Sequence, residues 1–248
     1  MGGGIYEIDC RDEMRVFYIN RDVDVRRRER IELALSEIGL SAERVSGIEG
    51  YELPDKLRDY YDFSMPPGET GCSASHLTAA SKILDQNLPW AVVLEDDARP
   101  TMAFQETVNE AVSSAPLDWD IIRLVRASKW ATHTVARMTK GKRLVRYSKI
   151  PPGAAGLIVS AAGARKLLKP RTVRLPIDVE IKWPWDLKLN VFGVVPPVVH
   201  IDASLTSTIS KRSRPRSYNR RARHLFNIQQ MGLVRYLLCA VQSIVGLT

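Results

Sequence analysis

The chain has 248 residues, of which 45% are apolar and 26% are charged, a composition typical of a globular protein with a substantial core. These proportions exclude a wholly disordered chain, a collagen-like repeat and a polytopic membrane protein. The net charge of +8 arises after Ser210: eight basic and no acidic residues follow it, and 28 of each precede it. Cys10, Cys72 and Cys239 lie far apart, so we expect no disulfide framework and a reducing, cytoplasmic location.

The first half of the chain alternates between strand and helix patterns. Residues 1–14 lack the basic and apolar regions of a signal peptide and are expected to be a leader. Strands are predicted where β-branched and aromatic residues cluster, at 15–20, 44–48 and 90–94 (WAVVL). Helices are predicted where apolar residues recur at helical spacing, at 26–38, 73–84 and 104–113. Residues 51–68 are expected to form a long loop.

The second half continues the same alternation. Further strands are predicted at 119–125, 153–160 and 191–199, the last interrupted by Pro196 and Pro197. Residues 129–149 are expected to form a hairpin or a variable loop, and a helix is expected over 161–168. Strands that alternate with helices predict one α/β domain with a mainly parallel central sheet. We place that domain at residues 15–210.

Three carboxylates directly follow the WAVVL strand: Glu95, Asp96 and Asp97. Residues two apart in an extended chain point the same way, so Glu95 and Asp97 are expected to face one site and Asp96 the other side. A divalent cation would relieve their repulsion, and Mg²⁺ or Mn²⁺ suits carboxylates and substrate phosphates. Ligands bind beyond the carboxyl ends of strands in open α/β sheets, where these residues fall. The alternative is a solvated acidic turn that caps the helix near Phe104.

Four segments in chain order resemble glycosyltransferase family 25. They are VFYINRDVDVRRRERI (16–31), GETGCSASHLTAASKIL (68–84), WAVVLEDDA (90–98), and GAAGLIVSAAGARKLL (153–168) with PID at 176–178. The enzymes of this family act in lipopolysaccharide and collagen glycan synthesis. The resemblance therefore implies a glycosyltransferase with a GT-A-type, Rossmann-like fold. It further implies inverting transfer of a hexose, usually galactose, from a UDP-sugar. The metal implied at the acidic motif, Mn²⁺ or Mg²⁺, would be bound by Asp97 and Glu95.

The donor nucleotide is expected near the first strand and the 73–84 helix. Arg26 suits a phosphate because a guanidinium donates two parallel hydrogen bonds, although a solvated helical turn would also place an arginine there. Ser75 and His76 fall in the first predicted helical turn, where free N–H groups attract anions, or else are packed structural residues. Glu49 stands where relatives commonly carry Asp. The residues expected to bind the donor are Asn20, Arg26, Glu49, Ser75, His76, Glu95 and Asp96.

The acceptor side of an inverting reaction needs a base, for which a carboxylate is the usual choice. Asp178 in the PID turn, a separate late segment, is the first candidate, although it would also serve as a helix cap or a ligand of an acceptor hydroxyl. Asp120 and Glu180 are alternatives. Leu157 stands where many relatives carry an aromatic residue, which is expected to change acceptor stacking. His200 is either a late-chain metal ligand or a structural residue.

The tail, residues 211–248, joins a basic cluster to an apolar, helix-like pattern. This combination favours attachment to the anionic inner face of the cytoplasmic membrane and a lipid-linked saccharide acceptor. A final helix packed on the domain is the alternative, and nucleic acid is less favoured because aromatic residues are sparse among the arginines. The contrasting hypothesis for the whole chain is a transferase-like binding module without turnover, which the tail recruits to membrane or nucleic acid.

Overall fold

The computed structural model describes residues 14–52, 65–202, 204–205, 220–234, 236–238 and 241. The strands of this part of the chain are β1 (Val16–Asn20), β2 (Glu43–Ser46), β3 (Trp90–Glu95), β4 (Ala98–Pro100), β5 (Ile121–Arg123), β6 (Thr132–Arg137), β7 (Arg143–Tyr147), β8 (Gly156–Ser160), β9 (Val191–Val195) and β10 (Val199–Ile201). Its helices are α1 (Val25–Ser36), α3 (Pro67–Asp85), α4 (Phe104–Ser114), α5 (Ala161–Leu167), α6 (Ile177–Lys182) and α7 (Arg220–Met231).

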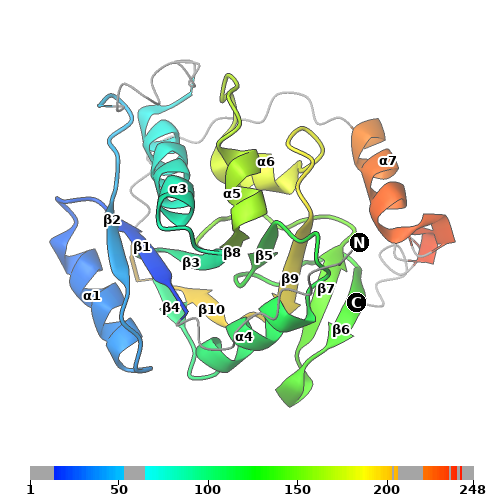
Figure 1. Cartoon of the computed structure of the whole chain (residues 1–248), viewed down its shortest axis with the longest axis horizontal. Helices are drawn as coiled ribbons and strands as arrows, with labels where there is room; N and C mark the ends of the chain where they lie inside the picture. Colours follow the sequence, from blue (N-terminus) through cyan, green and yellow to red (C-terminus); the bar gives the residue numbers. More distant parts are fainter. Residues whose placement is uncertain are drawn as a thin grey trace, which may run out of the picture.

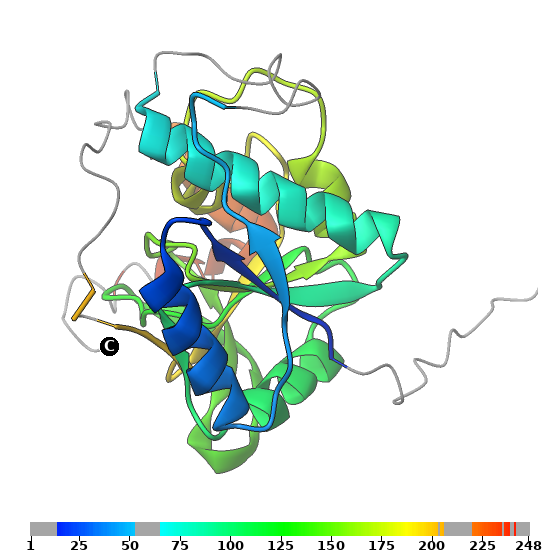
Figure 2. The ribbon, with the colours of Figure 1, turned by 90° about the vertical axis from the view of Figure 1, so that its left-hand side faces the viewer.

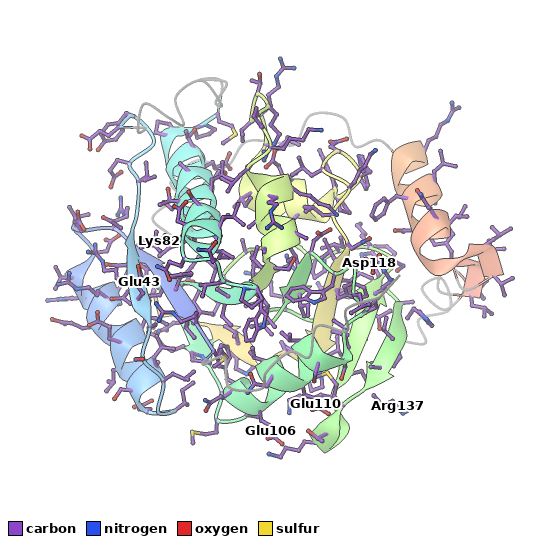
Figure 3. All side chains as sticks on the ribbon, in the orientation of Figure 1. Glu43, Lys82, Glu106, Glu110, Asp118 and Arg137 are labelled. Atoms are coloured by element: carbon purple, nitrogen blue, oxygen red, sulfur yellow. The ribbon has the colours of Figure 1, made fainter. Side chains whose placement is uncertain are left out.

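Eight strands form a central sheet in the order β2-β1-β3-β8-β5-β9-β7-β6. Six of them run in one direction, and only β7 and β8 run against them. The predicted α/β class with a mainly parallel sheet is therefore confirmed. The 129–149 segment forms the β6–β7 hairpin, one of the two forms expected for it. Glu106 and Glu110 of α4 hold its tip, where the Thr139 amide donates to Glu110 over 2.8 Å (Figure 3).

Helices cover both faces of the sheet: α3, α5 and α6 lie on one side, and α1 and α4 on the other (Figures 1 and 2). Successive side chains of β1 point to opposite faces of the sheet and so contribute to two separate hydrophobic cores. Phe17 packs in the core that contains Leu77 of α3, whereas Tyr18 packs in the core that contains Leu35 of α1. Because both faces are buried, β1 and β3 are apolar along almost their whole length, as strands of parallel sheets are.

Helix α3 begins six residues earlier than the sequence pattern predicted, at Pro67 instead of Ser73. Proline is favoured in the first turn because it has no N–H to leave unpaired, and its fixed φ already suits a helix. The expected 51–68 loop is therefore wrong at its end, and residues 53–64 lie outside the described part. Ser75 and His76 consequently sit in the third helical turn, where backbone N–H groups are already bonded, so the anion argument for them is wrong.

The chain leaves the main sheet after β9, at the proline pair that the sequence marked as an interruption. It then forms β10, which pairs antiparallel with β4 in a separate two-stranded sheet. Strand β4 directly follows the acidic motif. The Asp202 amide, just past β10, donates to the Asp97 carbonyl over 2.8 Å. The small sheet therefore holds the backbone of Asp97 in two ways: through β4, which begins at the next residue, and through the hydrogen bond from Asp202.

The described part of the tail is helical and packs on the body beyond α6 (Figure 1). The Asn227 side chain donates to the Ser148 carbonyl over 2.7 Å, and Phe226 meets Trp185 edge-on with ring centroids 6.4 Å apart. Tyr236 is buried in a small cluster with Ala131. The inner face of α7 is therefore packed on the domain, as expected from the alternative interpretation of the tail as a final packed helix. Within the described segments, no helix has the length and apolar character needed to cross a membrane.

Candidate functional site

The three carboxylates at the carboxyl end of β3 divide between the two sides of the sheet, and Asp96 points toward β1 and α1. The Asn20 side-chain amide donates to Asp96 Oδ2 over 2.8 Å, and Arg27 Nε donates to Asp96 Oδ1 over 2.8 Å. Asp96 is 7% exposed. Because both of its oxygens are already occupied, Asp96 and Asn20 organise the motif and have little capacity left to bind a ligand.

Glu95 points the other way, toward α3, as strand alternation predicted. Its Oε1 lies 3.1 Å from His76 Nε2 and 4.0 Å from Cys72 Sγ. His76 is buried, and Cys72 stands one helical turn before it on the same face of α3. The second predicted donor motif and the acidic motif therefore meet in one cluster.

Asp97 is the residue of the motif that has a buried carboxylate oxygen without a hydrogen-bond partner among the described residues. This atom is Oδ1, and Arg27 is 3.7 Å from the other oxygen, Oδ2. Burial, reinforced by Glu95 and opposed by Arg27, raises the pKa of Asp97 to about 6. A divalent cation fits this arrangement, because it would give the orphaned oxygen a partner and remove the repulsion between Glu95 and Asp97.

A cavity of about 110 Å³ opens between the carboxyl ends of β1 and β2 and the start of α3. Arg21 lies on its wall and donates to Asp24 over 2.6 Å and to Glu49 over 3.1 Å. Five of the seven residues predicted to bind the donor line this cavity: Asn20, Glu49, Ser75, Glu95 and Asp96. A concave site at this edge of an α/β sheet is suited to a nucleotide.

Ser75 shapes the cavity from behind. Its hydroxyl accepts from the Ile48 amide over 2.8 Å and donates to the Gly71 carbonyl over 2.7 Å. The hydroxyl is thus already used to tie the 47–50 segment to α3. The structural alternative given for Ser75 describes these contacts better than a direct phosphate contact.

Arg26 is not brought to the site with the other donor candidates, because it lies exposed on the outer face of α1. Arg27, one residue later, is the arginine that contacts Asp96, with only 13% of its side chain exposed. A signal for this was present in the sequence: Arg27 precedes the apolar Ile31 by four residues, and Ile31 precedes Leu35 by four. All three share the inner face of the helix.

Asp178 lies in the first turn of α6, and its Oδ2 accepts a hydrogen bond from the Gly153 amide over 3.1 Å. Its charge acts on the Cys72 thiol, whose pKa is raised well above its usual range first by burial and then by Glu95 and Asp178. Asp178 therefore belongs to the same electrostatic neighbourhood as the acidic motif, although 81 residues separate it from Asp97 in the sequence.

Arg123 of β5 is a site residue that the sequence reasoning missed. It is wholly buried and donates from Nη2 to the Pro152 carbonyl over 3.1 Å, but its Nε and Nη1 have no well-formed hydrogen bond to any described residue. Burial lowers its pKa, opposed by Tyr147 and Asp178. Arg123 and Asp178 together hold the Pro152–Gly153 turn, one through its carbonyl and the other through its amide.

The alternative acceptor-side candidates are engaged elsewhere. Asp120 is buried at the start of β5 and binds Lys166 over 2.5 Å, and Glu180 binds Arg171 over 2.6 Å. Leu157 is buried in the core, so the expected change in acceptor stacking at this position is wrong. His200 is exposed on β10 and is not part of the Cys72–His76–Glu95 cluster.

The fold and site thus define an α/β protein with a small cavity beside a carboxylate cluster at the carboxyl ends of its strands. Residues 14–181 match the family model described as "Glycosyltransferase family 25 (LPS biosynthesis protein)". The chain belongs to glycosyltransferase family 25, as the four sequence segments indicated.

Similar proteins in animals have different stated roles. The chain is 30% identical over 185 residues to a Bos taurus protein named "Probable inactive glycosyltransferase 25 family member 3" and 29% identical over 186 residues to an Aedes aegypti "Glycosyltransferase 25 family member". It is 27% identical over 182 residues to the Homo sapiens "Procollagen galactosyltransferase 2". These matches cover 66–68% of this chain but only 27–30% of the relatives, so the chain spans less than a third of their length.

Proposed function

We propose that the chain is an inverting hexosyltransferase that moves a hexose, galactose by preference, from a UDP-sugar to a saccharide acceptor. The observation that carries this proposal is the buried, unpartnered Asp97 Oδ1, which directly follows Glu95 and Asp96 on the wall of the cavity at the ends of β1 and β2. Family membership supports the reaction class, and the name of the procollagen galactosyltransferase relative supports galactose.

The residues present fit a divalent cation, Mn²⁺ or Mg²⁺, held by Asp97 and Glu95. When bound, the cation would supply positive charge to the departing diphosphate. Arg27 and Asn20 hold Asp96 and so fix the turn that presents Asp97. The test is a screen of UDP- and GDP-sugars for hydrolysis with Mn²⁺ and with EDTA. Hydrolysis of a UDP-hexose that EDTA abolishes supports the proposal, and no hydrolysis of any donor would refute it.

Asp178 is proposed as the acceptor-side base that takes the proton of the attacking hydroxyl. We expect Asp178→Asn to lower the rate of transfer by about 10²–10⁴-fold, the usual contribution of a general base. The amide oxygen still accepts from Gly153, so UDP affinity should change by less than about threefold, or about 0.7 kcal/mol. Steady-state transfer and calorimetry with UDP measure the two effects. Asp186→Asn, an exposed carboxylate beyond α6, is the matched control and should change neither. Loss of UDP binding with transfer intact would contradict the assignment.

The acceptor is proposed to be a lipid-linked saccharide, such as a lipopolysaccharide precursor, at the cytoplasmic face of the membrane. The outer face of the tail supports this, because its apolar residues are each more than half exposed: Leu225, Leu233, Val234, Leu237, Leu238 and Val241. Seven of the eight basic residues after Ser210 fall in 211–223, directly before this face. Basic and apolar residues side by side suit an anionic lipid surface.

We expect the triple variant Leu233→Gln/Leu237→Gln/Leu238→Gln to bind anionic vesicles at least about tenfold more weakly, since each buried leucine contributes on the order of 1.5–3 kcal/mol. The remaining binding should fall with salt, because it comes from the arginines. Co-sedimentation with anionic and neutral vesicles measures both effects. Point variants are preferable to truncation at 210, which would uncover Trp185 and Ala131. The control removes three exposed apolar residues of the body, Leu33, Met102 and Leu117. Equal binding by the two triple variants would contradict the membrane role.

A binding module without turnover is the second candidate, favoured by the "probable inactive" name of the Bos taurus relative. In that case the chain would bind UDP or membrane through the same surfaces but hydrolyse no donor. The presence of Glu95, Asp96 and Asp97 together favours the enzyme. Tail-dependent vesicle binding without metal-dependent hydrolysis of any UDP- or GDP-sugar would favour the module.

A further inference from the structure

Cys72, His76 and Glu95 bring a sulfur, a nitrogen and an oxygen together beside the cavity, which Cys72 and Glu95 line. Their ligand atoms all lie within 4.8 Å of one another. Cys72 and His76 are four residues apart on α3, so they project from one face of the helix, and Glu95 reaches them from the end of β3. Glu95 Oε1 lies 3.1 Å from His76 Nε2 and 4.0 Å from Cys72 Sγ.

This set of donors differs in chemistry from the carboxylates of the acidic motif. Thiolate and imidazole select borderline-soft cations, whereas Mg²⁺ and Mn²⁺ prefer oxygen. Tetrahedral zinc has bonds of about 2.0–2.3 Å, which places its ligand atoms roughly 3.3–3.8 Å apart. The spacings between Glu95 and its two partners lie within a few tenths of an ångström of that range. The third spacing, between Cys72 and His76, is at most 4.8 Å, so the side chains would have to move by up to about 1 Å to close the site around an ion.

We propose that Cys72, His76 and Glu95 form a binding site for a divalent cation of the Zn²⁺ class, distinct from the Mn²⁺ or Mg²⁺ site assigned to Asp97. Three protein ligands leave a fourth position open, as in zinc sites that accept water or a substrate group. Cys72 and Glu95 both line the cavity, so this position faces the space proposed for the nucleotide.

The charges around the thiol favour a cation. The charged groups with the largest effect on Cys72 are four carboxylates: Glu95, Asp178, Asp97 and Glu69. On binding, the Cys72 S–H bond breaks, its proton goes to water, and the thiolate electron pair forms the bond to the ion. The ion replaces the contact between His76 and Glu95, so no buried polar atom of the pair is left without a partner.

Sharing of Glu95 has a consequence for activity that rests on the proposed function. A Zn²⁺ ion bound to Glu95, Cys72 and His76 draws the Glu95 carboxylate away from Asp97 and blocks part of the cavity. Zn²⁺ is therefore expected to weaken Mn²⁺-dependent UDP binding. The oxygen-rich Asp97 site and the sulfur-containing site would thus compete through one carboxylate.

Co²⁺ is the probe for this site, because a thiolate ligand gives bound Co²⁺ a charge-transfer absorption that oxygen and nitrogen ligands do not give. The starting protein is the full chain with Cys10→Ser and Cys239→Ser, which leaves Cys72 as the only thiol. We expect the absorption on Co²⁺ addition, its loss on addition of Zn²⁺, and its absence after Cys72→Ser. His76→Gln keeps the thiol and should weaken Co²⁺ binding at least about tenfold, because loss of even an outer-shell partner of a metal site typically costs about 10–100-fold in affinity.

Each outcome decides the proposal. No charge-transfer absorption in the single-thiol protein, with folding confirmed by circular dichroism, would overturn it. Unchanged Co²⁺ affinity in His76→Gln would do the same, and this variant serves if Cys72→Ser does not fold. The transferase proposal is tested separately by UDP-sugar hydrolysis. A protein that shows the thiolate absorption but hydrolyses no donor would retain the metal site and lose the proposed function.

Discussion

Asp97→Asn is expected to lower the rate of hexose transfer at least about 100-fold, the scale expected when several kcal/mol of charge stabilisation are lost. The substitution keeps the shape of the side chain but removes the negative charge that faces the proposed cation. Folding should not suffer. The carboxylate is buried beside Glu95, and its Oδ1 has no described partner, so a neutral amide relieves repulsion. Transfer assays with Mn²⁺ and thermal unfolding measure the two effects.

Asp96→Asn is the matched comparison, because it changes the neighbouring residue in the same way and should give the reverse pattern for stability. Asp96 accepts from Arg27 and Asn20, and hydrogen bonds to charged groups contribute about 1.5–3 kcal/mol. Loss of the Asp96 charge should therefore lower the free energy of unfolding by about 1.5–3 kcal/mol. Full activity of Asp97→Asn, or activity of the unmodified chain that EDTA leaves unchanged, would contradict the role given to Asp97.

Much of the fold was predictable because its signals are local. The WAVVL strand and the helix that Gly39 follows depend on residue types within one element, and both appear with nearly the predicted bounds. The start of α3 was missed because apolar spacing fails in its first two turns. Glu69, Thr70 and Gly71 are buried there, although none has a large apolar side chain. Gly71 is buried against Ile48 and Gly50, a contact between distant segments that no local pattern records.

The site was predictable only where its residues are adjacent in sequence. The acidic motif was found because three carboxylates follow a buried strand, and strand alternation correctly separated Glu95 from Asp96. Arg123 was missed because it lies inside an apolar strand, and the groups that act on it, Tyr147 and Asp178, come from distant segments. The choice of Arg26 over Arg27 depended on which face of α1 turns inward, and attention to Ile31 and Leu35 would have decided it.

Gly71→Ala is expected to destabilise the protein by about 1–3 kcal/mol, the usual cost of overpacking, and to weaken UDP binding at least about tenfold. Alanine in a helix is normally favoured over glycine by about 1 kcal/mol, so the predicted sign is reversed. A Cβ at position 71 would lie 2.1 Å from the Ile48 carbonyl oxygen and 3.0 Å from the Gly50 nitrogen. Both obstacles are backbone atoms, which cannot rotate away as a side chain does.

UDP binding is expected to weaken because the close contact between α3 and residues 47–50 positions the wall of the cavity. Moving α3 outward would break the bond from the Ile48 amide to Ser75 and displace Glu49 from the cavity wall. Gly39→Ala is the control. It lies at a positive φ with nothing within 4 Å of the new Cβ, so it should cost about 1–2 kcal/mol of stability and leave UDP affinity unchanged. Thermal unfolding and calorimetry with UDP compare the two variants. Equal UDP affinity in Gly71→Ala and the unmodified chain would show that the cavity does not depend on this contact.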